Sequence, residues 1–460
     1  MVNHYLQCIK DNAALNAYVN VYTEEAISRA KALDERRNSG NIPGKLHGVV
    51  VAIKDVISYK DHPLSAASAI LKGFSAIYNA TAVQRLLDAE AIIIGSTNCD
   101  EFAMGSTNEN SVYGKVLNAL DESRVSGGSS GGAAVALQSG TCMISLGTDT
   151  GGSVRQPADF CGLIGLKPSY GRISRYGLIA YASSFDQIGI FGKNIDDVAL
   201  TLEVIAGEDE FDSTASSTPI DSYSTALHNR PLEKQKIGYF RQAFETEGLD
   251  SEIASQLKNF IEQLRSDGHT VEPIEFEYLD YIVPTYYILT TAEASSNLSR
   301  YDGIRYGYRN VDNLETLTEL YNSTRSTGFG KEVKRRILLG TFVLSAGYYD
   351  AYFTRAQKVR KILIDKTNLV FSQFDALLLP TAPSTAFKLG ETTKDPIATY
   401  MADIFTVFAN LTGIPAISLP LFWHSNSMPF GLQIMTNQFH ELHLMQLSKD
   451  WIKKYGVSGN

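Results

Sequence analysis

Three residues of this chain have the types and settings that acyl-transfer chemistry requires. Ser129 lies in the segment GGSSGG (residues 127–132), Ser153 lies in DTGGSVRQP (149–157), and Lys54 ends the apolar run VVVAIK (49–54). A serine hydroxyl attacks a carbonyl carbon efficiently when a neighbouring base takes its proton. None of the eight histidines lies between or beside the two glycine-rich segments. The sequence therefore favours a lysine as that base.

The residues before Ser153 suit a turn that binds an oxyanion. Gly151 and Gly152 allow backbone conformations that aim successive N–H groups into one concavity. Such a concavity stabilises the negative charge that develops on a carbonyl oxygen under attack. An ordinary glycine turn after the β-rich run 143–146 explains the same residues, and both interpretations stay open at this point.

A catalytic role for Lys54 requires a neutral amine. Because the ordinary pKa of a lysine is about 10.4, neutrality at pH 7 costs roughly 4–5 kcal/mol unless burial or hydrogen bonding lowers that pKa. An apolar strand inside a core is a suitable place for such a lowering. The alternative is a lysine at a strand end whose amine reaches solvent.

Other motif matches in this region carry less weight. GGSSGG also fits a flexible loop or the anion-binding start of a helix. Residues 127–131 match the G-x-S-x-G pattern of α/β-hydrolases, but the preceding LDESRV (120–125) is turn-like rather than a strand. Asp149 opens a DTG triplet, half of an aspartic-protease site, and the sequence has no second half. We therefore interpret Asp149 as structural. Nucleotide-binding motifs and metal-spaced His/Cys clusters are absent from the sequence.

Composition sets broad limits on function. Of the 460 residues, 44% are hydrophobic and 20% charged, which is typical of a globular chain with a sizeable core. A net charge of −9 and a pI near 5.5 argue against a dominant nucleic-acid-binding face. The four cysteines are scattered, and no run of 18 apolar residues or signal-peptide core appears. We therefore expect a soluble cytoplasmic protein with reduced thiols.

The elements that must position these residues alternate along the chain. Helices are expected over about 23–40, 194–207 and 251–267. Short β-rich runs occur at 49–53, 91–94, 143–146, 237–240, 376–379, 417–421 and 432–435. This alternation predicts an α/β fold with a largely buried sheet. Residues 208–231 are polar and rich in Ser and Thr, which fits either a domain linker or a long excursion within one fold.

Together these segments resemble the amidase signature family. The similarity runs from Gly48 to about Gly192 and includes VVVAIKD, NCDEFAMGSTNENS (98–111), RVSGGSSGGAA and SLGTDTGGSVRQPADFCG. Segments 286–309, 328–353 and 403–420 are most similar to the glutaminase subunits of tRNA-dependent amidotransferases. The resemblance implies one amidase domain (1–460) with a mixed central β-sheet covered by helices on both faces. Its expected parts are an N-terminal helical segment (1–45), a catalytic core (46–207), the polar connection (208–231) and a C-terminal part (232–460).

The resemblance also implies roles for individual residues. It implies that Ser153 is the nucleophile, that Ser129 is a proton relay held by a cis peptide bond, and that Lys54 is the base. The implied oxyanion hole is made by the backbone N–H groups of Thr150, Gly151, Gly152 and Ser153.

For glutamine recognition the resemblance implies three side chains. Arg336 would bind the α-carboxylate, for which a planar guanidinium is suited. Asp403 would bind the α-ammonium, and Tyr287 would add a polar contact. Arg335 and Tyr286 adjoin two of these residues and are the alternatives at those positions.

The implied activity is hydrolysis of glutamine through a glutamyl ester on Ser153. Ammonia would pass to a partner subunit that uses ATP and magnesium to convert Glu-tRNA(Gln) to Gln-tRNA(Gln), and a small third subunit would complete a heterotrimer. This chain is expected to hold no metal or cofactor, to contact tRNA mainly through the partner, and to bind no membrane. A free-standing amidase acting on another small amide and a non-catalytic scaffold subunit are the alternatives.

Overall fold

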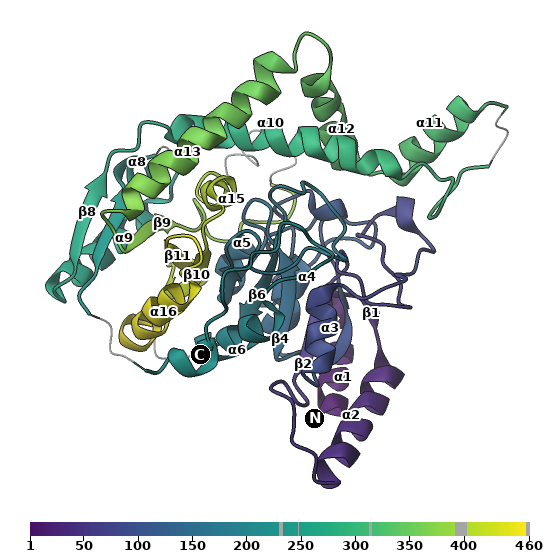
Figure 1. Ribbon diagram of the computed structural model, residues 1–460, viewed down its shortest axis with the longest axis horizontal. Coiled ribbons are helices and arrows are strands. Elements are labelled where there is room, and N and C mark those ends of the chain that lie inside the picture. Colours follow the sequence, from purple (N-terminus) through teal and green to yellow (C-terminus); the bar gives the residue numbers. More distant parts are fainter. Residues whose placement is uncertain (230–232, 247, 312–314, 392–402, 457–460) are drawn as a thin grey trace.

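The computed structural model describes residues 1–229, 233–246, 248–311, 315–391 and 403–456 (Figure 1). Within them, one 11-stranded sheet has the strand order β1-β3-β2-β4-β6-β5-β10-β11-β9-β7-β8. The strands are β1 (Tyr18–Val21), β2 (Val50–Lys54), β3 (Ile92–Thr97), β4 (Ile144–Thr148), β5 (Ile164–Lys167), β6 (Ile188–Gly192), β7 (Lys236–Phe240), β8 (Thr270–Ile274), β9 (Ala376–Pro380), β10 (Ala416–Trp423) and β11 (Pro429–Met435). Both halves of the chain contribute strands to this sheet.

The sheet is mixed, as the resemblance implies. β2 pairs in parallel with β3 and β4, and β7 pairs in parallel with β8 and β9. The other strand pairs are antiparallel. The α-helices of the described residues are α1 (Val2–Asp11), α2 (Thr23–Asn38), α3 (Thr81–Asp88), α4 (Gly131–Gln138), α5 (Arg155–Cys161), α6 (Ile195–Ile205), α7 (Tyr223–Ala226), α8 (Arg241–Glu245), α9 (Ser251–Ser266), α10 (Leu279–Asn297), α11 (Leu317–Gly328), α12 (Lys331–Leu344), α13 (Arg355–Phe371), α15 (Val407–Thr412) and α16 (Glu441–Tyr455).

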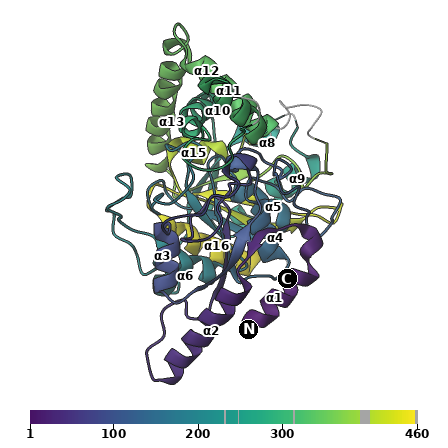
Figure 2. The ribbon, with the colours of Figure 1, turned by 90° about the vertical axis from the view of Figure 1, so that its right-hand side faces the viewer.

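Helices cover both faces of the sheet, and β2 shows how. Val50 and Ala52 belong to one buried cluster together with the small residues of α4. Val51 and Ile53 belong to a second cluster that includes side chains of α3 and α6. Figure 2 shows α3 and α6 on one side of the sheet and α4 and α5 on the other. Because side chains alternate along a strand, Lys54 lies on the same face as Val50 and Ala52, toward α4.

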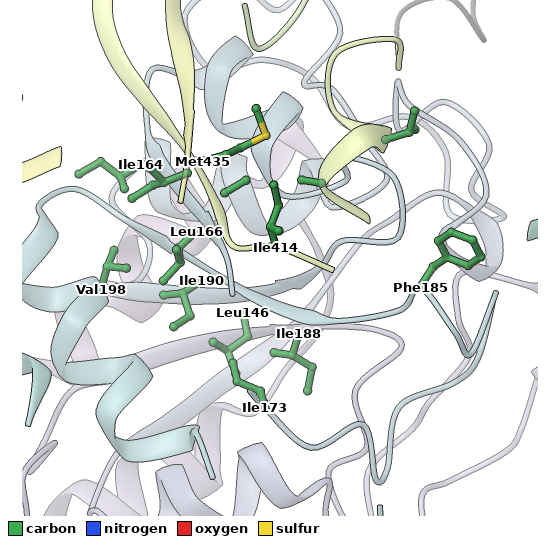
Figure 3. Close-up of a cluster of buried hydrophobic side chains, with 14 of the residues drawn as sticks. Leu146, Ile164, Leu166, Ile173, Phe185, Ile188, Ile190, Val198, Ile414 and Met435 are labelled. Atoms are coloured by element: carbon green, nitrogen blue, oxygen red, sulfur yellow. The ribbon is translucent and has the colours of Figure 1, made fainter. Parts of the chain in front are cut away.

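The second cluster fills the centre of the molecule. In Figure 3 its strand residues Leu146, Ile164, Leu166 and Ile190 lie together with Val198 of α6. These side chains are at most 1% exposed. Close packing of this kind gives the neighbouring strand ends fixed positions.

Helices of the second half lie over the loops of the first half. Figure 1 shows α10, α12 and α13 together at the top of the view, above α5 and α15. α10 packs against both α12 and α13. Because α10 carries Tyr287 and α12 carries Arg336, this arrangement brings two predicted recognition residues toward the glycine-rich segments.

The predicted elements agree with the structure in kind, with differences at their ends. All seven β-rich runs are strands, while β1, β5, β6 and β8 are absent from the prediction. β5 contains Gly165, where a side chain would overlap Ala158 of α5, so close packing gives this strand a loop-like composition. Asn194 caps α6 by accepting the N–H of Asp197. Thr23 is the first residue of α2 and makes no capping bond.

The polar segment 208–231 falls partly outside the described residues. Its described part, 208–229, runs against the first half: Arg172 donates to the carbonyl oxygen of Thr218 (3.1 Å), and Arg175 pairs with Asp212 (3.2 Å). Among the helices that the structure describes, none has the length and apolar character needed to span a membrane.

Candidate active site

The predicted catalytic residues lie where three neighbouring strands end. Since β2 is parallel to both β3 and β4, their carboxyl ends meet at one edge of the sheet. In sheets of this kind such an edge is the usual position of a binding site. Lys54 is the last residue of β2, β3 leads to Asp100, and β4 ends at Thr148, five residues before Ser153.

Lys54 is completely buried among hydroxyl groups. Its Nζ lies 2.7 Å from Oγ of Ser129, 2.9 Å from Oγ of Ser130 and 2.8 Å from Oγ1 of Thr148. Burial lowers the pKa of Lys54 to about 8, although nearby acidic groups favour its charged form. At that pKa about one tenth of the lysine is neutral at pH 7 and half at pH 8. The alternative of a lysine that reaches solvent is wrong, because the side chain has no exposed surface.

The backbone around Ser129 is held in place from both sides. The Gly128–Ser129 peptide bond is cis, as the resemblance implies. The N–H of Asp100 donates to the carbonyl oxygen of Ser129 (3.1 Å), and the N–H of Ser130 donates to the carbonyl oxygen of Ser153 (3.2 Å). The segment with the relay serine is therefore bonded directly to the segment with the nucleophile.

Ser153 itself is 8% exposed. Within the part of the chain that the structure describes, its hydroxyl has no hydrogen-bond partner. A hydroxyl that is partly exposed and makes no competing bond is available to a substrate.

The turn before Ser153 is built on a buried ion pair. The Asp149 carboxylate accepts hydrogen bonds from the guanidinium of Arg155 (2.8 Å) and from the N–H of Gly152 (2.9 Å). Although burial by itself favours the neutral acid, the Arg155 charge holds the pKa of Asp149 well below its usual range. Asn410 of α15 donates to the same carboxylate (3.0 Å). Asp149 thus has the structural role that the sequence indicates.

One of the four predicted oxyanion donors is already engaged. The N–H of Gly152 points to Asp149 (2.9 Å), so it is not a free donor in this structure. Within the described residues, the N–H groups of Thr150, Gly151 and Ser153 have no acceptor. A side chain at Gly151 would overlap the hydroxyl of Tyr286, and one at Gly152 would overlap Thr406. Only glycine lets these neighbours approach the turn.

Arg336 faces the interior, whereas its neighbour Arg335 does not. The Arg336 side chain is 7% exposed, and it donates to the hydroxyl of Tyr181 (2.7 Å) and to Glu332 (2.9 Å). The Arg335 side chain is 36% exposed and pairs with Glu332 from the outside. Of the two arginines, Arg336 is therefore placed to reach a ligand inside the molecule.

Tyr287 joins Arg336 to Asp403. The Arg336 guanidinium lies 5.6 Å from the centre of the Tyr287 ring, and the Tyr287 hydroxyl donates to the Asp403 carboxylate (2.8 Å). Burial raises the pKa of Asp403 to about 7. An arginine and a carboxylate on either side of a tyrosine match the two charged groups of an amino acid. Tyr286 borders Gly151, so consecutive tyrosines connect this cluster to the nucleophile turn.

The structure adds three residues that sequence reasoning missed. Ser130 and Thr148 contact Lys54, and Tyr181 contacts Arg336. Ser130 was within reach of the sequence argument, because it follows Ser129 in the same glycine-rich segment. Thr148 follows a β-rich run, as Lys54 does, which indicates their proximity less strongly than the position of Ser130 beside Ser129 does. No feature of the sequence distinguishes Tyr181.

Comparison with known proteins places this chain in a family. The family model described as Amidase matches residues 1–445. This chain belongs to the amidase family. It is 48% identical, over 98% of its length and 94% of the relative's, to the A subunit of glutamyl-tRNA(Gln) amidotransferase from Pelodictyon phaeoclathratiforme. A protein of the same name from Koribacter versatilis is 48% identical over 96% of this chain and 92% of its own.

Solved structures give the same result. The crystal structure of the A subunit of glutamyl-tRNA(Gln) amidotransferase from Thermotoga maritima superposes with a TM-score of 0.79 and 37% identity, and covers 100% of this chain and 92% of its own. The peptide amidase of Stenotrophomonas maltophilia has a TM-score of 0.81 and 26% identity, over 99% of this chain and 93% of its own. The α/β fold with a mixed sheet is thus the amidase fold.

Among the described residues, no group of three or more His, Cys, Asp or Glu side chains is arranged to hold a metal ion.

Proposed function

We propose that this chain is the glutamine-hydrolysing subunit of a tRNA-dependent amidotransferase, with Lys54, Ser129 and Ser153 as its catalytic triad. The observation that carries the proposal is the buried Lys54 amine, 2.7 Å from the relay hydroxyl of Ser129. The identity of 48% with relatives that are named as the A subunit of glutamyl-tRNA(Gln) amidotransferase supports the choice of this activity within the family.

In the acylation step, Oγ of Ser153 attacks the side-chain amide carbon of glutamine. The serine proton passes through the Ser129 hydroxyl to the neutral amine of Lys54. The N–H groups of Thr150, Gly151 and Ser153 bind the oxyanion. The amide nitrogen then takes the proton back through the relay, and the C–N bond breaks. Ammonia departs, and a glutamyl ester remains on Ser153.

In the deacylation step, water attacks the ester carbonyl. Its proton follows the same path to Lys54, and the proton returns to Ser153 as the C–O bond breaks. Glutamate leaves, and the three side chains return to their starting protonation states. One base thus serves both steps, and the amine of Lys54, which lies among three hydroxyl groups, suits that role.

Glutamine recognition uses the second half of the chain. Arg336 binds the α-carboxylate, the ionised Asp403 binds the α-ammonium, and the Tyr287 hydroxyl lies between them. The burial of Arg336 supports this role, because a buried cation that binds a carboxylate is weakly screened by water.

The amide acceptor lies outside this chain. We propose that ammonia passes to a partner subunit, which activates the glutamate of Glu-tRNA(Gln) with ATP and magnesium. A small third subunit would complete a heterotrimer, and tRNA would be held mainly by the partner. The net charge of −9 supports this division, because it gives the chain no general attraction for nucleic acid.

A free-standing amidase acting on another small amide is the second candidate. The similarity to a peptide amidase, which covers 99% of this chain, favours it at the level of the fold. The Arg336–Tyr287–Asp403 cluster favours glutamine, because its guanidinium and carboxylate are complementary to the α-carboxylate and α-ammonium groups of an amino acid, which a simple amide lacks.

The deciding experiment measures ammonia release from glutamine by the purified chain, alone and co-expressed with its candidate partner subunits and tRNA. We expect weak release alone and a strong rise with partners. High partner-independent turnover with poor preference for glutamine would establish the free amidase instead.

Replacing Ser153 by Ala should abolish ammonia release and leave the circular dichroism spectrum unchanged. Full activity of that variant would refute the nucleophile, and a serine-reactive probe that fails to label Ser153 would favour a scaffold.

A further inference from the structure

Proton transfer in this site creates a buried positive charge. When Lys54 takes the proton of Ser153, its ammonium group is surrounded by the hydroxyls of Ser129, Ser130 and Thr148, none of which carries a charge. A buried ion without a counter-charge is costly. Some acidic group near Lys54 must therefore stabilise the cation.

Four acidic groups face Lys54 from the neighbouring elements. Cys99 and Asp100 follow β3, Asp149 follows β4, and Asp186 precedes β6. Burial raises the pKa of the Cys99 thiol far above neutrality, so it is uncharged. Asp149 is already paired with Arg155 at 2.8 Å. Two carboxylates remain.

Of these two carboxylates, Asp186 is the weaker candidate for stabilising protonated Lys54. It accepts hydrogen bonds from the hydroxyl of Thr150 (2.7 Å) and from two backbone N–H groups. Burial raises the pKa of both carboxyls, and of the two charges that of Asp100 acts more strongly on Lys54.

Asp100 is also bonded through its backbone to the segment that carries the relay serine. Its N–H donates to the carbonyl oxygen of Ser129 (3.1 Å). The Asp100 carboxylate lies directly against Gly128, so close that a Cβ atom at residue 128 would overlap it. The carboxylate oxygens accept the N–H groups of Asn108 (2.9 Å) and Asn110 (3.1 Å). No lysine or arginine of the described residues bonds to it, although the charges of Lys54 and Arg336 both act on it.

We propose that Asp100 is a positioning residue of the triad: its backbone fixes the relay serine, and its carboxylate supplies the negative charge that stabilises protonated Lys54. Asp100 keeps its own charge throughout. The proton moves from Ser153 through Ser129 to Lys54 as the new C–O bond forms at Ser153. The same proton then returns to the amide nitrogen as the C–N bond breaks, and it leaves with ammonia. This inference rests on the proposed triad and assigns it a fourth member that does not touch the substrate.

The test measures the reactivity of Ser153 in the absence of glutamine. A fluorophosphonate probe labels an activated serine, and the labelling rate is followed by intact-protein mass spectrometry between about pH 6 and 10. Because the neutral form of Lys54 is the base, the rate for the unmodified chain should rise with a midpoint near pH 8. Asp403 and Arg336 bind glutamine rather than the probe, so their titration does not enter.

The Asp100→Asn variant removes the charge and keeps the size. Without that charge the ammonium form of Lys54 is less stable, so the midpoint should move about one pH unit lower. The rate at high pH should fall about tenfold, because the base is weaker. Asp100→Ser, which also removes the charge, should give the same displacement and replaces the first variant if that one does not fold. An unmoved midpoint in the folded variant would overturn the proposal.

Asp55→Asn is the matched control. Asp55 adjoins Lys54 in the chain and is equally buried, and burial raises its pKa to about 6. Its carboxylate bonds to Ser65 and to the N–H of Ala67 (3.1 Å), and its charge is not among the main ones that act on Lys54. This variant should leave the midpoint near pH 8, and an equal displacement in it would contradict a specific role for Asp100. Absence of labelling in the unmodified chain would instead refute the nucleophile and the proposed function.

Discussion

Arg155 and Asp149 form an ion pair in which neither side chain is exposed to solvent, with 2.8 Å between Nη2 and Oδ1. Arg155 also donates to the carbonyl oxygen of Thr406 (2.8 Å) and to the side chain of Asn410 (2.7 Å). Asp149 holds the turn that carries Ser153, and Thr406 lies three residues after Asp403, the proposed recognition residue. One buried guanidinium thus links the turn of the proposed nucleophile to the proposed glutamine site.

Replacing Arg155 by Met should destabilise the fold strongly. The change leaves the Asp149 charge buried without its partner, which typically costs about 3–5 kcal/mol. Urea unfolding followed by circular dichroism measures this loss. The control is Arg335→Met, which breaks the more exposed pair with Glu332 and should have a small effect. Equal losses of unfolding free energy in the two variants would show that the buried Arg155 network stabilises the fold no more than a surface ion pair does.

Replacing Arg336 by Lys should weaken glutamine binding without removing the charge. A lysine loses the paired N–H groups that fit a carboxylate, so KM should rise about tenfold to a hundredfold while kcat changes little. The control is Arg335→Lys, whose side chain is directed outward. Steady-state ammonia release over a range of glutamine concentrations gives both constants. If Arg335→Lys raises KM and Arg336→Lys does not, the two arginines exchange roles.

Glutamine binding should weaken as pH falls through neutrality. Asp403 has a pKa raised by burial to about 7, and only its ionised form attracts the α-ammonium group. Protonation at lower pH removes that attraction, so KM should rise below about pH 7. Asp403→Asn should bind weakly at every pH and show no such rise. A KM that stays constant between about pH 6 and 8 in the unmodified chain would remove Asp403 from the binding site.

Much of the fold follows from sequence patterns that depend on neighbours in the chain. The β-rich runs and the helix over 251–266 are visible because burial of one face imposes a period on the residues. β5 and β6 are not visible, because Gly165 and Gly189 are set by close packing, against Ala158 of α5 at Gly165 and against the backbone of Leu166 at Gly189. Glycine occurs at those positions because neighbouring segments pack closely against the strand, and its presence lowers the apparent strand propensity of the sequence.

The candidate site also has a part that local sequence patterns indicate and a part that they do not. Ser129 and Ser153 stand out because glycines surround them, and the resemblance adds the roles. The bond from the N–H of Gly152 to Asp149 lies within one turn, but the Asp149 carboxylate is also bound by Asn410 from a distant segment. Tyr181 meets Arg336 from 155 positions away. No local pattern encodes that second contact, because it depends on how α10 and α12 lie over the loops of the first half.

The three hydroxyls around Lys54 should differ in their contributions to catalysis. Ser129 is the proposed relay, whereas the Ser130 hydroxyl already donates to the carbonyl oxygen of Thr148 (3.0 Å). Ser130 can therefore only accept a hydrogen bond from Lys54, and it holds the amine rather than passing a proton. Removing a relay typically costs a factor of about 10²–10⁴ in rate. Removing a holding bond worth about 1 kcal/mol costs roughly fivefold.

Ammonia release by Ser129→Ala, Ser130→Ala and Thr148→Val tests this order. We expect the first variant to lose about a hundredfold or more in kcat, and each of the others about tenfold or less, with KM for glutamine unchanged in all three. A loss in Ser130→Ala as large as in Ser129→Ala would mean that Ser130 also carries the proton. In that case its hydroxyl must leave the carbonyl oxygen of Thr148 during the reaction, and Thr148→Val, which keeps that carbonyl, would not reproduce the loss.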